Sequence, residues 1–461
     1  MSGFAGSVTR LGLSLALSVV LFSLVPTRAW SAEPQYRLAT FAADVTPPVG
    51  SPLCGGLVKP VSGVSEPLQA LGIILLGAGD PIVLCAVDWC EIRNRDHAIW
   101  REQLAKAAGT TPERVAVQAL HQHNAPIADT AAQELLQSST SPLLIQDDAW
   151  MQQALNNVAQ AVQQARQKSQ PLTGIAVGEA TVVEVASNRR VMGPDGKVRA
   201  VRTSATKDAT VRAAEVGVID PQLKSISFWN GSQKLAVLHY YGTHPMSYYG
   251  DGIVSSDFVG IARERRTAED HVPHVYFTGC GGNVTAGKYN DGNPDNRPIL
   301  ANHILEAMRA SEKTARITAV GEIAWLSQPV VLPLNTLKEE DVLAAIGNAQ
   351  SSAGTRIGAA MKLSYQRYCA AGTPIQFSAL HLGDEVRIVH LPGEPFIEYQ
   401  LFAQETAKEK FVAVAGYGDG GCGYIPLEKS FEEGGYEPTW AFAAPASENV
   451  ITKTIEALLK P

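Results

Sequence analysis

The chain has 461 residues, of which 45% are hydrophobic and 18% charged, a composition that excludes intrinsic disorder. Its formal net charge is −7 and it has no block of Lys or Arg, which excludes a nucleic-acid-binding surface because phosphate binding needs clustered cations. We therefore expect a small-molecule or lipid-like substrate.

The first 32 residues have the pattern of a secretory signal peptide. Arg10 precedes an apolar stretch over 11–25, and Ser31 and Ala32 lie at a small-residue cleavage site. The alternative is an uncleaved anchor, although Pro26 interrupts the run of ~20 apolar residues that a membrane span needs. We expect export to a secreted or periplasmic location.

Residues 33–461 predict a single large α/β domain, with a mixed central sheet and flanking helices. Apolar runs alternate with helical patterns, which favours this class over an all-β fold. The helices are expected over 93–107, 147–168, 257–269, 298–310, 395–408 and 447–459.

Five apolar runs predict strands, and each ends within a few residues of a side chain that can bind a metal or polarise a carbonyl. The runs span residues 115–120, 235–241, 274–278, 386–390 and 412–415. The side chains that follow are, in the same order, His121 with His123, His244, Thr285, Glu394 and Tyr424. Because ligands bind beyond the carboxyl ends of strands in open α/β sheets, we expect these ends to form one active-site pocket.

Two histidines and a carboxylate form a common catalytic zinc set that leaves a position open for water. His121 and His123 lie two apart, so one could bind the metal while the other serves as a base. Two ordinary surface or core histidines are the alternative. Pro245 stiffens the turn that follows His244. Glu394 follows a buried run, where a charge is costly unless it is paired or metal-bound, although a helix N-terminal acid would give the same pattern.

Arg189 and Tyr436 are candidate donors to an oxyanion or an amide, worth about 3 kcal/mol in a transition state when preorganised. An ordinary surface arginine and a half-buried tyrosine are the alternatives. Residues 188–210 mix Arg, Gly, Pro and Lys, a pattern that predicts a long surface loop around Arg189.

The chain has six cysteines, which are compatible with a few disulfides in an oxidising compartment. Their pairing cannot be derived from the sequence. No two of them have the C-x-x-C spacing of a zinc ribbon or a thioredoxin-type site, so a structural cysteine-zinc site is not expected.

The residues singled out above resemble the catalytic domain of the neutral/alkaline (non-lysosomal) ceramidase family, zinc amidases that split the N-acyl bond of ceramide. The likeness runs from the ADVTP motif at 43–47 to about Pro445. It implies one Zn²⁺ per chain. The ligands that the resemblance implies are the first histidine of the H-x-H element, the histidine of THPMS, the acid of PGE and a tyrosine: His121, His244, Glu394 and Tyr424.

The same resemblance implies four catalytic residues. It places His123 near the water that the zinc would activate. The Asn-Arg element suggests that Arg189 contacts the substrate. A second tyrosine, twelve residues after the zinc-binding one, hydrogen-bonds substrate in the family, and here Tyr436 follows Tyr424 at that spacing. Thr285 stands where the family has a serine that contacts the substrate amide.

The chain departs from the family pattern at three places. The GDVSPN element is GNVTAG at 282–287, so that an acid is lost and a methyl group is added. A glycine-rich stretch after the histidines is replaced by NAPIA at 124–128. The family's C-terminal β-sandwich domain has no counterpart in the sequence. These departures concern the substrate pocket more than the zinc ligands.

We therefore expect an exported zinc-dependent amidohydrolase that cleaves an N-acyl amide bond, in the ceramidase manner N-acylsphingosine to fatty acid and sphingoid base. Zinc would activate a water, and His123 would take its proton. One alternative is a zinc hydrolase of a polar acyl compound such as an acylated sugar, a peptide-like amide, an ester or a lactone. Another is a non-catalytic secreted binding protein. The expected partners are a small-molecule or lipid amide and, at its periphery, a membrane surface; no protein or nucleic-acid partner is expected.

Overall fold

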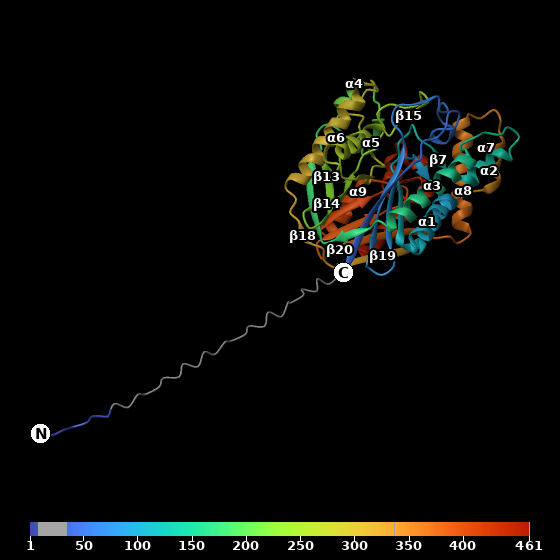
Figure 1. Ribbon diagram of the computed structural model, residues 1–461. Coiled ribbons are helices and arrows are strands. Elements are labelled where there is room, and N and C mark those ends of the chain that lie inside the picture. The colour runs from blue at the N-terminus through green and yellow to red at the C-terminus, as the bar shows by residue number, and fades with distance from the viewer. Residues whose placement is uncertain (8–34, 336, 461) are drawn as a thin grey trace. The chain divides into compact units, whose positions relative to one another are not determined.

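The computed structural model describes residues 1–7, 35–335 and 337–460, so the predicted signal peptide lies outside the described residues except for 1–7. Residues Pro34–Pro461 form one compact unit, drawn as a ribbon in Figure 1. No helix in the described part combines the length and the apolarity needed to cross a bilayer.

Three larger sheets form the framework of this unit. The first has the order β6-β4-β3-β1-β8, with β1 Tyr36–Asp44, β3 Gln69–Leu76, β4 Ile82–Val87, β6 Val115–Ala119 and β8 Gln170–Leu172. The second has the order β16-β14-β13-β9-β18, with β9 Gly174–Thr181, β13 Gln222–Asn230, β14 Gln233–Tyr241, β16 His274–Thr278 and β18 Thr318–Ala319. The third has the order β19-β20-β21-β23, with β19 Ile323–Val330, β20 Ile375–Leu382, β21 Val386–His390 and β23 Phe411–Ala415.

Each of these sheets is antiparallel except for one parallel pair at its edge. The parallel pairs are β4 with β6, β14 with β16 and β21 with β23. Every residue of β4, β6, β16 and β21 is buried, which explains why these strands appear in the sequence as continuous apolar runs. All five predicted strands are confirmed, and the residues that follow them lie at the carboxyl ends of the parallel pairs.

Short two-stranded pairings connect the loops beyond these strand ends. The pairs are β2 Gly63–Val64 with β15 Ile253–Val254, β5 Glu91–Ile92 with β7 Ile127–Ala128, β10 Ser187–Asn188 with β17 Val284–Thr285, β11 Arg190–Met192 with β12 Val198–Val201, and β22 Glu394–Pro395 with β24 Tyr424–Ile425. They hold in place the backbone that carries the candidate site residues.

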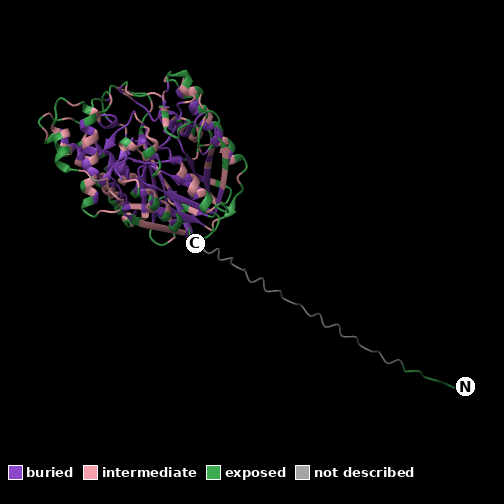
Figure 2. Cartoon of the chain, turned by 180° about the vertical axis from the view of Figure 1, so that it is seen from behind, coloured by how far each residue is buried: buried purple, intermediate pink, exposed green. Residues whose placement is uncertain are grey.

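Helices cover the sheets in groups, and Figure 1 shows α5 beside α6 and α1 beside α3. Helices α1 and α3 pack together on the first sheet, α5 and α6 on the second, and α9 and α11 on the third, while α2 and α7 pack on α8. The eleven described helices are α1 Asn94–Ala108, α2 Thr130–Gln137, α3 Asp148–Arg166, α4 Ala209–Ala213, α5 Asp257–Asp270, α6 Asn296–Lys313, α7 Glu339–Gly347, α8 Ala353–Ala370, α9 Ile397–Thr406, α10 Ser430–Glu433 and α11 Ser447–Leu459. In Figure 2 the strands are mostly buried, and the helices turn exposed faces outward.

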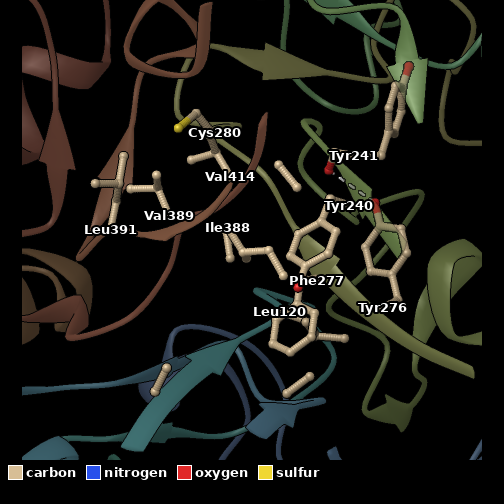
Figure 3. Close-up of a cluster of buried hydrophobic side chains, with 14 of the residues drawn as sticks. Leu120, Tyr240, Tyr241, Tyr276, Phe277, Cys280, Ile388, Val389, Leu391 and Val414 are labelled. Atoms are coloured by element: carbon tan, nitrogen blue, oxygen red, sulfur yellow. Dashed lines mark hydrogen bonds between the residues drawn. The ribbon is translucent and has the colours of Figure 1, made fainter. Parts of the chain in front are cut away.

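The three sheets meet in a common apolar core. Figure 3 shows Leu120 beside aromatic side chains of the second sheet and aliphatic side chains of the third, all of them buried. Within it the rings of Tyr240 and Phe277 stack with centroids 5.1 Å apart. Burial of this area holds the parallel edges of the sheets together and so brings their carboxyl ends to one place.

The mixed α/β class and all six predicted helices are confirmed. Three details differ from the sequence predictions. The sheet is divided in three rather than being one central sheet. Residues 395–408 do not begin a helix at Pro395, because that residue pairs in a strand with Ile425. The surface loop predicted over 188–210 is wrong in part, since it contains β11, β12 and buried Arg189.

Candidate metal centre

His121 follows β6 with its backbone in the left-handed region, at φ 72°. Its side chain is buried, and Nδ1 lies 3.0 Å from the carbonyl oxygen of Cys90. Since a carbonyl can only accept, Nδ1 carries the hydrogen and Nε2 is left to bind a ligand. A backbone carbonyl that fixes the tautomer in this way is the usual support of a metal-binding histidine.

His244 follows β14 and is held in the same manner. Its backbone amide donates to the carbonyl of Val284, and its Nδ1 lies 2.7 Å from the carbonyl oxygen of Gly281. The imidazole is 1% exposed. Again Nδ1 donates, so Nε2 is directed away from the strand end with its lone pair free.

Glu394 lies where two backbone segments approach each other closely. It pairs with Tyr424 across the parallel strands β22 and β24, and its amide donates to the carbonyl of Gly423 at 2.9 Å. The preceding Gly393 has φ 57°, and a Cβ there would lie 2.4 Å from Sγ of Cys422. Glycine is therefore required immediately before the acid, which accounts for the PGE sequence.

These three side chains converge on one point. Oε2 of Glu394 lies 3.1 Å from Nε2 of His121 and 3.2 Å from Nε2 of His244. The three ligand atoms lie within 4.8 Å of one another, and all three residues are buried. The first and last of them, His121 and Glu394, lie 273 positions apart in the sequence, so only the packing of the three sheets brings the group together.

The charges in this group fit a cation. Burial lowers the pKa of His121, but the Glu394 carboxylate outweighs it and raises that pKa to about 9. Burial lowers the pKa of His244 to about 4, so its Nε2 faces the carboxylate with a lone pair and no proton. Two facing lone pairs repel unless a cation lies between them. The donor set therefore fits a zinc ion, with two imidazoles and a carboxylate as ligands.

Tyr424 lies beside this group. Its hydroxyl oxygen is 3.3 Å from Nε2 of His244 and accepts a hydrogen bond from Arg189 at 2.9 Å. Burial raises the pKa of Tyr424 well above its usual range, and Arg189 acts in the opposite direction. The guanidinium also lies over the ring of Tyr436, 5.3 Å from its centroid. Arg189 thus connects the two tyrosines whose spacing the sequence singled out.

A cavity of about 90 Å³ opens onto the group, and His123 and Tyr436 line it together with His121, Glu394 and Tyr424. Nδ1 of His123 lies 3.0 Å from the carbonyl of His121, so Nδ1 donates and Nε2 is the basic nitrogen. Tyr436 is 40% exposed and packs edge-on against Tyr424. The rest of the cavity lining includes the apolar side chains of Leu57, Ile127, Met361, Trp440 and Phe442.

Three predicted site residues do not line this cavity: Arg189 and His244, which both contact Tyr424 of the cavity lining, and Thr285. Thr285 is buried in β17, where its hydroxyl donates to the carbonyl of Arg202 at 3.3 Å and accepts from the amide of Gly287 at 3.2 Å. Both roles of the hydroxyl are therefore already occupied. Contact of Thr285 with substrate stays a prediction.

Glu91 is a cavity residue that sequence reasoning missed. Its Oε1 lies 4.0 Å from Nδ1 of His121, and its other oxygen pairs with the buried Arg93. Burial raises the pKa of Glu91, and the charge of Arg93 partly offsets this rise. The acid therefore lies beside His121 with a charged partner of its own. The signal was available, because Glu91 follows the apolar run of β4 just as the other site residues follow theirs.

Fold and site together define a mixed α/β protein with a buried His/His/Glu centre at the carboxyl ends of its strands. Among solved structures, a ceramidase complexed with C2 has a TM-score of 0.69 at 14% identity, covering 93% of this chain and 75% of that chain. Neutral ceramidase from Pseudomonas aeruginosa has a TM-score of 0.67 at 14% identity, covering 93% of this chain and 74% of that chain. The chain therefore has the neutral ceramidase fold, as the sequence resemblance predicted. Neither a protein-family model nor a curated protein matches the sequence.

Proposed function

We propose that this protein is an exported zinc-dependent amidohydrolase that cleaves an N-acyl amide bond. The observation that carries the proposal is the convergence of His121, His244 and Glu394, with both Nδ1 atoms already committed to backbone carbonyls. Tyr424 would complete the ligand set, its phenol supported by the charge of Arg189. Zinc bound there would supply a Lewis acid for the scissile carbonyl and a water whose pKa is lowered to about 7.

The remaining side chains would handle protons and the substrate. Burial, with His121 and His244 nearby, lowers the pKa of His123 well below its usual range, so its Nε2 is unprotonated at neutral pH and can accept the proton of the attacking water. The same nitrogen would then protonate the leaving amine. Tyr436, on the rim of the cavity, would donate to the substrate's polar group.

The apolar part of the cavity lining favours an acyl group as the part of the substrate that enters it. Burying hydrocarbon against Leu57, Met361 and Trp440 would be favourable, at about 25 cal/mol per Å². Ceramide is one such N-acyl amide. A polar compound with a short acyl group is the second candidate, because a cavity of about 90 Å³ leaves little room for a long hydrocarbon chain. A series of N-acyl amides of rising chain length separates the two, because activity that falls with length would favour the polar substrate.

The first test concerns the metal. Protein purified with zinc should contain at least one equivalent and hydrolyse an N-acyl amide, and His244→Ala and Glu394→Ala should each lose one equivalent and the activity. The chain offers a matched control, because His239, His274 and Glu312 form a second His/His/Glu group. There Nε2 of His239 lies 2.7 Å from Nδ1 of His274, so these nitrogens bond each other. His239→Asn should therefore keep the metal. Full zinc content and turnover in Glu394→Ala would overturn the proposal.

A further inference from the structure

A second group of metal-binding atoms lies in the wall of the same cavity. Sγ of Cys54, Sγ of Cys90 and a ring nitrogen of His123 lie within 4.8 Å of one another. Cys54 stands at the start of a short 3-10 helix, Cys90 lies between β4 and β5, and His123 follows β6. All three residues line the cavity next to the first metal-binding group.

The three donors are available to a ligand. Nδ1 of His123 is committed to the carbonyl of His121, which leaves the Nε2 lone pair. Both cysteines are buried free thiols. Sγ of Cys90 makes a long contact of 3.8 Å to Nδ1 of His121, a nitrogen that already donates to the carbonyl of Cys90 at 3.0 Å. Cys54 adopts φ 47°, a left-handed conformation that residues with a Cβ seldom adopt and that is often found at functional sites.

We propose that Cys54, Cys90 and His123 bind a second, soft metal ion such as Zn²⁺ or Cd²⁺, and that its binding switches off hydrolysis. Two thiolates and an imidazole are the ligands that such ions prefer. With bonds of about 2.3 Å to sulfur and 2.0 Å to nitrogen, tetrahedral ligands lie about 3.5 to 4 Å apart, which is compatible with the observed spacing. Binding releases the thiol protons to solvent.

The two groups are distinct sites with different donors. The first has two imidazoles and a carboxylate, and none of its members belongs to the second. His123, a member of the second group, nevertheless lies close to the first. Its ring centroid is 4.7 Å from that of His121 and 6.0 Å from that of His244. An ion on the thiols would therefore take the basic nitrogen of His123 away from the hydrolytic reaction. This inhibitory effect rests on the proposed function, whereas metal binding by the thiols does not.

The binding test uses Cd²⁺ on the full, zinc-loaded protein under reducing conditions. Thiolate coordination gives a sulfur-to-metal charge-transfer absorbance, and we expect it to saturate at one added equivalent. Cys54→Ser and Cys90→Ser should lose this absorbance while keeping the first zinc. Cys369→Ser is the matched control, because Cys369 is buried to the same 6% exposure as Cys54 but lies on α8 outside the group.

Two results would overturn the second site. One is a charge-transfer absorbance that is absent in the unaltered protein or that survives in Cys54→Ser and Cys90→Ser. The other is a thiol titration of protein prepared without reductant that finds Cys54 and Cys90 joined in a disulfide.

The inhibitory effect has a separate test. A second equivalent of zinc should lower the hydrolytic rate of the unaltered protein and of Cys369→Ser, and the ratio of rates with and without that zinc should return to one in Cys90→Ser. A ratio below one in Cys90→Ser would overturn the switch. If the protein hydrolyses no amide at all, the proposed function fails, and the Cd²⁺ titration still decides whether the thiols bind metal.

Discussion

Arg189 concentrates several interactions of the site in one buried side chain. It donates to the hydroxyl of Tyr424, lies over the ring of Tyr436 and approaches Glu437 with Nε 3.7 Å from a carboxylate oxygen. Burial works against its charge, but Tyr424 and Glu437 outweigh it and raise the pKa of Arg189 above its usual range. A fixed positive charge beside the phenol can thus stabilise negative charge that develops on ligand or substrate.

We expect Arg189→Met to lower kcat by about 100-fold while zinc content is retained, because a preorganised positive charge is removed and none of the proposed metal ligands is replaced. Glu437 keeps its partner, since Arg190 bonds its other oxygen at 2.9 Å. Steady-state kinetics with metal analysis checks this, and the exposed Arg199→Met is the control for loss of one charge. An unchanged kcat would contradict the role given to Arg189.

Within the elements, the strand β21 carries a histidine that has no part in the site. His390 is 3% exposed, and neither ring nitrogen has a hydrogen-bonding side chain among the described residues. Its neighbours include the rings of Phe277 and Trp325. Burial lowers the pKa of His390 to about 3, so the strand holds a neutral imidazole. The strand therefore resists protonation of this side chain.

This burial predicts an acid sensitivity of the fold. Because the folded-state pKa of His390 lies below its unfolded value of about 6.5, stability is full above pH ~6.5 and is lost as the pH falls towards 3. The loss between pH 7 and pH 4 amounts to about 3 kcal/mol. Denaturant unfolding at both pH values should show that the free energy of unfolding falls by about 3 kcal/mol less in His390→Leu than in the unaltered protein. His271→Asn, which removes an exposed histidine, should leave the loss unchanged.

For the whole molecule, the first metal-binding group connects the three sheets. His121 follows the edge of the first sheet, His244 the second and Glu394 the third. An ion bound to all three would link segments that are far apart in the chain, and it would bind the folded state in preference to the unfolded one. Metal occupancy and stability are therefore expected to be coupled.

Zinc at about 1,000 times its Kd should stabilise the fold by about 4 kcal/mol, seen as a rise in Tm over chelator-treated protein. In a Cys90→Ser background, which removes the proposed thiol site, Glu394→Gln should remove this zinc-dependent rise, because it takes away one of the three ligands. Glu312→Gln, in the second His/His/Glu group, should keep the rise even though it breaks ion pairs with Lys234 and Arg266. A rise of equal size in Glu394→Gln would mean that zinc binds elsewhere.

The sequence determined the strands, six of the eleven described helices and the candidate metal ligands at the strand ends, because burial and backbone sterics leave a local periodicity along the chain. Helices α2, α4, α7, α8 and α10 were missed. Helices α4 and α10 have only five and four residues, and the other three mix small and polar residues with their apolar ones. The tertiary structure alone decided that the strand ends come from three sheets, that the hydroxyl of Thr285 is committed to the backbone, and that Cys54 meets Cys90 and His123. Such contacts depend on how sheets pack across long sequence separations, and no local pattern encodes that packing.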